Sequence, residues 1–186
     1  MRRFLRVLVA AGLPVTACDS PTSPSVEQAR YEALLAGTSF TLGAARDSAF
    51  ASELRPYRFH SGFWFAGSRV ARSADVWSAV FDTLQAYRAP KVTAPDVDFQ
   101  HEMVVLALYG SAASSGYVVR IRHATLVRDT VFVLAARERP GGNCGVLDVL
   151  TTPTDARVIP ARASPVVTLF ARYVFDCDSG KVRPEW

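Results

Sequence analysis

Lysine is scarce in this chain of 186 residues, where Lys91 and Lys181 are the only two. Arginine supplies the rest of the positive charge, and no basic run is long enough to follow a phosphate backbone. The formal net charge is +4, but residues 1–17 hold three arginines and no acid, so residues 18–186 carry only +1. We therefore expect no nucleic-acid partner.

The chain also lacks the short motifs Gly-x-Ser-x-Gly, Ser-x-x-Lys and His-Glu-x-x-His, which fix a nucleophile or a metal against its activating group. His101 and Glu102 begin the last of these motifs, but no second histidine follows one helical turn later. The three histidines are scattered, and no Cys-x-x-Cys or His-x-x-x-His spacing occurs. We expect no enzymatic activity, no metal and no cofactor, although distant residues can still assemble a triad.

The first 17 residues have the form of a lipoprotein signal peptide. Arg2 and Arg3 precede a short apolar run that Arg6 interrupts, too short for the roughly 20 apolar residues that span a bilayer. The run ends in the lipobox-like sequence Val15-Thr16-Ala17-Cys18. Processing there would leave Cys18 as a lipidated amino terminus, and we expect the mature protein to be anchored to the cell envelope outside the cytoplasm.

Residues 18–25 are predicted to form a flexible tether, because they contain two prolines and short polar side chains without apolar periodicity. The remaining residues 26–186 are long enough for a single globular domain, and 49% of the chain is hydrophobic. The segment 26–58 shows only a weak helical pattern and stays unassigned.

Acylation of Cys18 would leave Cys144 and Cys177 as the only thiols in an oxidising compartment. We therefore predict a disulfide between them. Two unrelated buried thiols are the alternative.

One amphipathic helix is predicted over about 74–88, with Ser73 as its N-cap and Asp75 near the positive end of its dipole. Its apolar side chains recur at helical spacing: Val76, Trp77, Val80, Phe81 and Leu84.

Six or seven strands are expected around this helix. Met103 to Tyr109 is a continuous apolar run typical of a central strand, and Val119 and Ile121 alternate with solvated arginines. Thr130 to Ala136 follows after a short turn, and Val167 to Phe175 is the last clear strand. No regular alternation of strand and helix appears, so we predict an α+β fold with a mainly antiparallel sheet or sandwich.

The aromatic segment from Phe59 to Phe65 and the segment that follows it to Arg72 are also predicted to be strands. Alternation would place Phe59, Phe63 and Phe65 in the core, and leave Trp64 on the opposite face. Trp64 would then either pack on the helix or contact a partner.

The loop from Gly110 to Tyr117 consists of small residues that lead to a glycine and then to an aromatic residue. Gly116 is expected to adopt a positive φ, and Tyr117 to begin the next strand. A plain hairpin connection would explain the loop; a partner contact is the functional alternative. The candidate partner-binding residues are Ser114, Ser115, Gly116, Tyr117 and Trp64.

The chain from about residue 62 to 175 resembles the PrcB-like protease-complex lipoproteins, with their carboxy-terminal domain over about 97–175. The resemblance is carried by the helix with Trp77 and by the following segments: Val97-Asp98-Phe99, Met103 to Gly110, Ser115-Gly116-Tyr117 and Arg139-Pro140-Gly141-Gly142. It implies a non-catalytic, protein-binding subunit that associates with a secreted subtilisin-like protease and stabilises it.

Two alternatives remain. Ser114-Ser115-Gly116-Tyr117 also resembles the inserting loop of chagasin-type cysteine-protease inhibitors, although the Asn-Pro that opens their loop is absent. The other alternative is a purely structural envelope lipoprotein.

Overall fold

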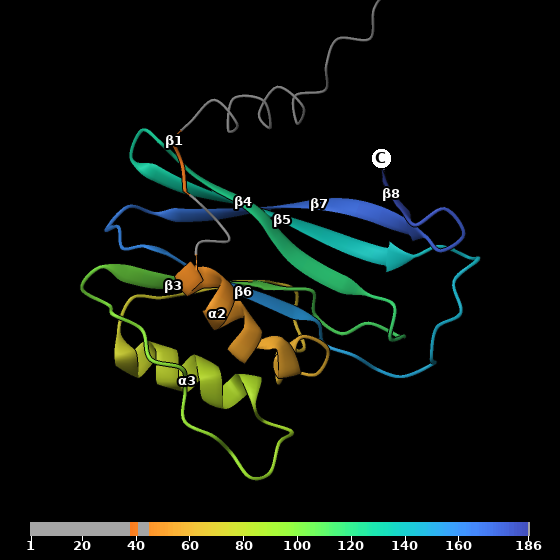
Figure 1. Cartoon of the computed structure of the whole chain (residues 1–186), viewed down its shortest axis with the longest axis horizontal. Helices are drawn as coiled ribbons and strands as arrows, with labels where there is room; N and C mark the ends of the chain where they lie inside the picture. The colour runs from red at the N-terminus through yellow and green to blue at the C-terminus, as the bar shows by residue number, and fades with distance from the viewer. Residues whose placement is uncertain (1–37, 41–44, 186) are drawn as a thin grey trace, which may run out of the picture.

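A computed structural model describes residues 38–40 and 45–185 of the chain. Two β-sheets pack face to face, and two α-helices, α2 and α3, cover the outer side of the smaller sheet (Figure 1). The α+β, sheet-rich fold predicted from the sequence is therefore confirmed.

The larger sheet has five strands in the order β1-β4-β5-β7-β8. The strands are β1 (Thr38–Ser39), β4 (Val118–Val127), β5 (Thr130–Pro140), β7 (Val166–Asp176) and β8 (Lys181–Pro184). A tight turn joins β4 to β5, with Arg128 at a positive φ of 54°. The pairing is mainly antiparallel as expected, but β5 and β7 run parallel, because the chain passes through the second sheet between them.

The smaller sheet has the order β2-β3-β6, formed by β2 (Gly67–Ala71), β3 (Glu102–Leu108) and β6 (Thr154–Pro160). The predicted central strand from Met103 to Tyr109 is confirmed as β3, whose residues from Met103 onward are buried on both faces. Strand β6 was not predicted from the sequence.

Helix α3 (Ala74–Leu84) begins where expected, since the Ser73 side chain accepts a hydrogen bond from the Val76 N–H. It ends four residues before the predicted boundary of 88. Helix α2 (Ala45–Glu53) and the 3₁₀ helix η1 (Arg55–Tyr57) lie in the segment left unassigned.

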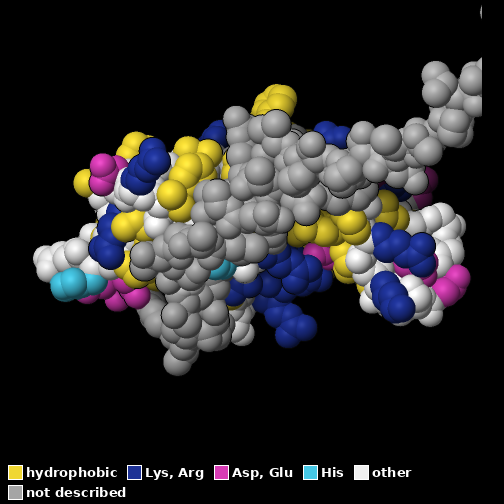
Figure 2. Space-filling model, turned by 90° about the horizontal axis from the view of Figure 1, so that it is seen from above, with side chains coloured by type: hydrophobic (Ala, Val, Ile, Leu, Met, Phe, Trp, Pro, Cys, Tyr) yellow, Lys and Arg dark blue, Asp and Glu magenta, His cyan; other side chains and the backbone are white. Residues whose placement is uncertain are grey.

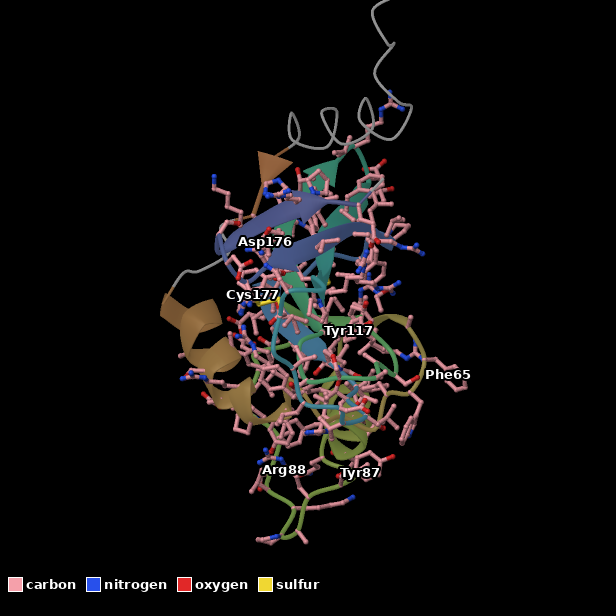
Figure 3. The ribbon with its side chains drawn as sticks, turned by 90° about the vertical axis from the view of Figure 1, so that its right-hand side faces the viewer. Phe65, Tyr87, Arg88, Tyr117, Asp176 and Cys177 are labelled. Carbon is pink, nitrogen blue, oxygen red and sulfur yellow. A yellow bond between two sulfur atoms is a disulfide. The ribbon has the colours of Figure 1, made fainter. Side chains whose placement is uncertain are left out.

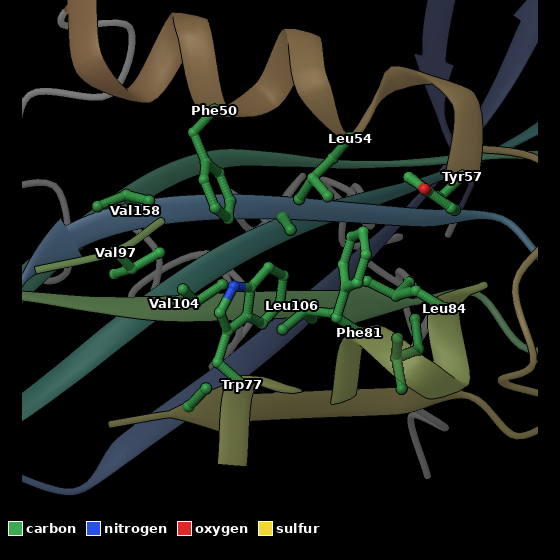
Figure 4. Close-up of a cluster of buried hydrophobic side chains, with 13 residues drawn as sticks. Phe50, Leu54, Tyr57, Trp77, Phe81, Leu84, Val97, Val104, Leu106 and Val158 are labelled. Carbon is green, nitrogen blue, oxygen red and sulfur yellow. The ribbon is translucent and has the colours of Figure 1, made fainter. Parts of the chain in front are cut away.

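Two apolar cores hold these layers together. The first lies between the helices and β3, where Phe50 of α2 packs on Trp77 of α3, and Trp77 packs on Phe81, in one cluster with Leu106 (Figure 4). The second lies between the sheets and consists mainly of small and branched residues around Met103, among them Val119, Ile121, Val131 and Val133. The predicted inward face of Val119 and Ile121 is thereby confirmed.

The strand predicted over Phe59 to Phe65 is wrong. Regular strand structure starts only at Gly67, where β2 confirms the strand predicted in the segment to Arg72, and the residues before Gly67 make isolated contacts with loops. Phe65 is 86% exposed and Phe59 is 45% exposed, so of the three expected core aromatics only Phe63 packs against the core. Among the described strands none pairs with this segment, so its alternate side chains have no neighbouring strand to bury them.

Candidate functional site

Three loops gather at one end of the two sheets, which we call the loop end. They are residues 58–66 before β2, residues 109–117 between β3 and β4, and residues 141–153 between β5 and β6. Figure 1 shows this end at its right-hand side, and Figure 3 looks directly at it. The loop end contains all the candidate partner-binding residues from the sequence, Trp64 and Ser114 to Tyr117.

Backbone hydrogen bonds fasten the three loops to one another. The Ser111 N–H donates to the Trp64 carbonyl at 3.0 Å, and Ala112 and Thr151 exchange two bonds of 2.8 Å. Further along, the Ser115 N–H donates to the Leu147 carbonyl at 3.0 Å, and the Leu147 N–H donates to the Ser115 side chain at 3.0 Å. The loops therefore form one connected framework.

The loop from Gly110 to Tyr117 is packed rather than projecting. Ser114 is only 9% exposed, and its carbonyl accepts a hydrogen bond from the Thr151 hydroxyl at 2.9 Å. Gly116 does not have the predicted positive φ; the loop's left-handed glycine is Gly110, at φ 87°. A Cβ on Gly116 would lie 2.6 Å from Val146 Cγ1 and 2.9 Å from Pro140, so close approach is what requires glycine there.

Tyr117 precedes β4, as expected, and lies half-buried near the middle of the view in Figure 3. Its ring meets the Tyr109 ring edge to face at a centroid distance of 5.3 Å. It therefore forms part of an aromatic pair at the end of the sandwich.

Trp64 is 44% exposed and contacts Tyr87, beyond the end of α3, edge to face at 6.0 Å. Phe65, next in the chain, is more exposed still and extends beyond the ribbon outline in Figure 3, with Tyr87 below it. The sequence placed Trp64 on the face opposite the core, either packed on the helix or in contact with a partner, and it missed Phe65 because strict alternation placed Phe65 in the core.

A second exposed apolar segment was missed altogether. Val146, Leu147, Val149 and Leu150 are 41%, 72%, 40% and 54% exposed. A run of this composition reads as a buried strand, but its backbone pairs with the 109–117 loop only at single positions. We use "loop-end surface" for the exposed apolar side chains of the 58–66 and 141–153 loops, together with Tyr87, which contacts Trp64: Phe59, Trp64, Phe65, Tyr87, Val146, Leu147, Val149 and Leu150.

The segment that carries Leu147 is held at its start by a cysteine pair. Cys144 and Cys177 lie at disulfide distance, with S–S 2.06 Å and Cα atoms 5.2 Å apart, as the sequence predicted. The Gly141 N–H also donates to the Phe175 carbonyl at 2.8 Å. These contacts fix the segment to the end of β7.

The described residues contain no group of three or more His, Cys, Asp or Glu side chains that could hold a metal ion. His101 and Asp98 form an exposed pair, Nδ1 to Oδ2 2.7 Å, at the opposite end of β3 from the loop end. The hydrogen bond with His101 lowers the pKa of Asp98.

Cys18 and the predicted signal peptide and tether lie outside the described residues. Within the part of the chain that the structure describes, no helix is both long and apolar enough to cross a membrane.

In comparisons with known proteins, no family model, no curated protein and no solved structure matches the chain.

Proposed function

We propose that this chain is a lipid-anchored, extracytoplasmic protein that binds another protein through its loop-end surface, and that its partner is a secreted protease which it stabilises without inhibiting it. The exposure of Phe65 and Leu147 on neighbouring, hydrogen-bonded loops carries the proposal.

Exposed apolar side chains that cluster on one surface are typical of protein-protein interfaces. Aromatic residues such as Trp64, Phe65 and Tyr87 supply large contact areas at low conformational cost, and dominate the energetics of many interfaces. The hydrogen bonds between the loops and the cysteine pair at Cys144 reduce the entropy that would be lost on binding. These features support binding by a preorganised surface.

The position of β1 is consistent with an anchored protein. Strand β1 pairs with β4 at Leu126 and Thr125, so the chain enters the described fold near the Arg128 turn. The loop end begins at Val118, eight residues away along β4, which corresponds to roughly 26 Å at the rise of a strand. A lipid on Cys18 would thus be joined to the end of the larger sheet that lies opposite the loop end.

The choice of a protease partner rests on the resemblance to the PrcB-like lipoproteins. Direct inhibition by an inserting loop is less well supported, because Ser114 is buried and Gly116 lies against Val146 and Pro140. An inhibitory loop of the chagasin type has to enter an active site, and this segment is covered by its neighbours. A purely structural envelope role would give no reason for the exposed aromatic residues.

Site-specific photo-crosslinking tests the proposal in the native host. A photoreactive phenylalanine analogue is placed at Phe65 or Leu147 of the full-length chain, and crosslinked proteins are identified. Val76 of α3, 45% exposed, and Val167 of β7, 39% exposed, are matched control positions at the opposite end of the sheets from the loop-end surface. We expect one protein, a secreted protease, at both test positions and at neither control.

The identified protease is then mixed with the purified, detergent-extracted lipoprotein, and its affinity and activity are measured. Phe65→Ser and Leu147→Ser should each weaken binding, by about tenfold or more for a central contact, while Val76→Ser leaves it unchanged. Retained protease activity in the complex supports a stabilising subunit, and loss of activity supports the inhibitor. Equal crosslinking at all four positions would overturn the proposal.

A further inference from the structure

Along the inner face of strand β5, the side chains change from apolar to basic. Its inward residues are first apolar, with Val131, Val133 and Ala135 packed against the smaller sheet. The next two positions on the same face are Arg137 and Arg139. The change occurs because β5 has eleven residues and β3 only seven, so β5 extends past the end of the smaller sheet at Leu108.

Arg137 lies on the part of β5 that extends past β3, and neighbouring groups hold its side chain in place. Its guanidinium lies 3.8 Å from the centroid of the Phe170 ring, and its Nη2 donates to the Leu108 carbonyl at 3.2 Å. Its Nε is buried without a hydrogen-bond partner. Burial lowers the pKa of Arg137, and the charge of Arg172 acts in the same direction.

Arg172 is the neighbour of Arg137 across the parallel β5–β7 pair, so two positive charges lie side by side. Most other arginines of this sheet have acidic partners: Arg120 and Arg122 contact Glu138, Arg139 contacts Glu185, and Arg183 contacts Asp176. Basic and acidic side chains accordingly stand together in several groups in Figure 2. Within residues 38–40 and 45–185, no carboxylate lies within ion-pair distance of Arg137 or Arg172.

Two tyrosines and one carboxylate complete the surroundings. The Arg137 guanidinium is 5.9 Å from the Tyr109 ring centroid, and Tyr109 packs against Tyr117. Burial raises the pKa of the Tyr109 hydroxyl, and the neighbouring Tyr117 adds to this effect. Glu185 accepts hydrogen bonds from Arg139 through Nε at 2.8 Å and Nη2 at 2.6 Å, and these bonds lower its pKa, with a smaller contribution from the charge of Arg172.

We propose that Arg137 and Arg172, flanked by Tyr109 and Tyr117, bind a carboxylate of an acidic segment in the partner protein. This inference rests on the proposed function, since Tyr117 belongs to the loop end. Guanidinium groups bind carboxylates through paired, charge-assisted hydrogen bonds, and Phe170 keeps that of Arg137 in a fixed orientation. An incoming carboxylate would also relieve the repulsion between the two arginines.

The test uses a small probe and needs no partner. The detergent-extracted full-length lipoprotein is titrated calorimetrically with a blocked peptide of four glutamates, and with the matching peptide of four glutamines. We expect saturable binding of the glutamate peptide at low salt and none of the glutamine peptide. Arg172→Gln, whose side chain makes no described hydrogen bond, should weaken glutamate-peptide binding by about tenfold.

Arg128→Gln is the matched control, because Arg128 is exposed in the turn at the opposite end of the sheet. Its affinity for the glutamate peptide should equal that of the wild type. Equal weakening in the two variants, or no saturable binding to the wild type, would overturn the carboxylate site. Phe65→Ser should bind the glutamate peptide as tightly as the wild type does, because Phe65 is not part of the arginine site. The peptide titration therefore tests the carboxylate site alone, and the photo-crosslinking tests the loop-end surface alone.

Discussion

The Asp155 carboxylate accepts a hydrogen bond from the backbone N–H of Ile121 at 2.8 Å, and so joins the two sheets. Asp155 lies on β6 and is only 4% exposed, whereas Ile121 lies on β4 next to the irregularity in its pairing with β5. The Arg58 and Arg157 side chains each lie 3.5 Å from the same carboxylate. A buried charge at this position is therefore compensated from both sheets and from the segment before β2.

Replacement of Asp155 by alanine should destabilise the fold by about 3 kcal/mol, because a buried N–H and two arginines lose their shared acceptor. Chemical unfolding of the purified protein measures the loss. Asp148→Ala, at an exposed position, is the control and should change stability by less than about 0.5 kcal/mol. Similar stabilities of the two variants would show that the contact contributes little.

The pH dependence of stability provides a separate test of Asp155. Burial raises its pKa above the ordinary value of 3.8, so the folded protein binds this proton more tightly than the unfolded chain does. This contribution to stability is fully present below pH 3.8 and is lost as pH rises through the folded-state pKa. Urea unfolding of the wild type and of Asp155→Asn measures this effect. The free energy of unfolding of the wild type, relative to that of the variant, should fall as pH rises from 3.8. A difference that stays constant or grows with pH would contradict the prediction.

The cysteine pair should be oxidised in protein purified from the native envelope. Non-reducing peptide mapping should recover the peptides of Cys144 and Cys177 linked together, whereas two alkylatable thiols would refute the assignment. Replacing both cysteines by serine should lower stability by about 3 to 4 kcal/mol in the chain-entropy model, since the loop they close spans 33 residues. The segment with Leu147 should also become more susceptible to proteolysis.

Local sequence signals determined the parts of the fold that were predicted correctly. Ser73 caps α3 through a hydrogen bond to a residue only three positions away. Val119 and Ile121 are both buried because they lie on the same face of one strand, which the alternation of residues predicts directly. The loop end depends instead on distant contacts. The exposure of Phe65 follows from the absence of a pairing strand, and Gly116 is required because Pro140 and Val146 approach it from 24 and 30 residues away.

Anchoring makes a prediction about Cys18. Cys18→Ser should abolish incorporation of labelled palmitate and block cleavage by the lipoprotein signal peptidase, because the thiol is the acylated group. Cys177→Ser controls for nonspecific effects of losing a cysteine and should still be labelled. Palmitate on the Cys18→Ser protein would show that the lipid anchor is assigned to the wrong residue.

Gly110 and Gly116 are predicted to require glycine for two different reasons, a positive φ and close packing. Gly116→Ala should destabilise by about 1 to 3 kcal/mol through overpacking, because its Cβ would lie 2.6 Å from Val146 Cγ1 and 2.9 Å from Pro140. Gly110→Ala should also destabilise, since φ is 87° and the added Cβ would lie 2.7 Å from the Ala66 nitrogen.

Gly142→Ala is the matched control for both, because nothing lies within 4 Å of its added Cβ and its φ is not positive. Thermal unfolding should leave this variant within about 0.5 kcal/mol of the wild type. Val146→Ala combined with Gly116→Ala should recover part of the loss, because the nearest atom, Val146 Cγ1, is removed. It should not rescue Gly110→Ala, whose strain comes from the backbone itself; rescue of both, or of neither, would refute close packing of Val146 on Gly116.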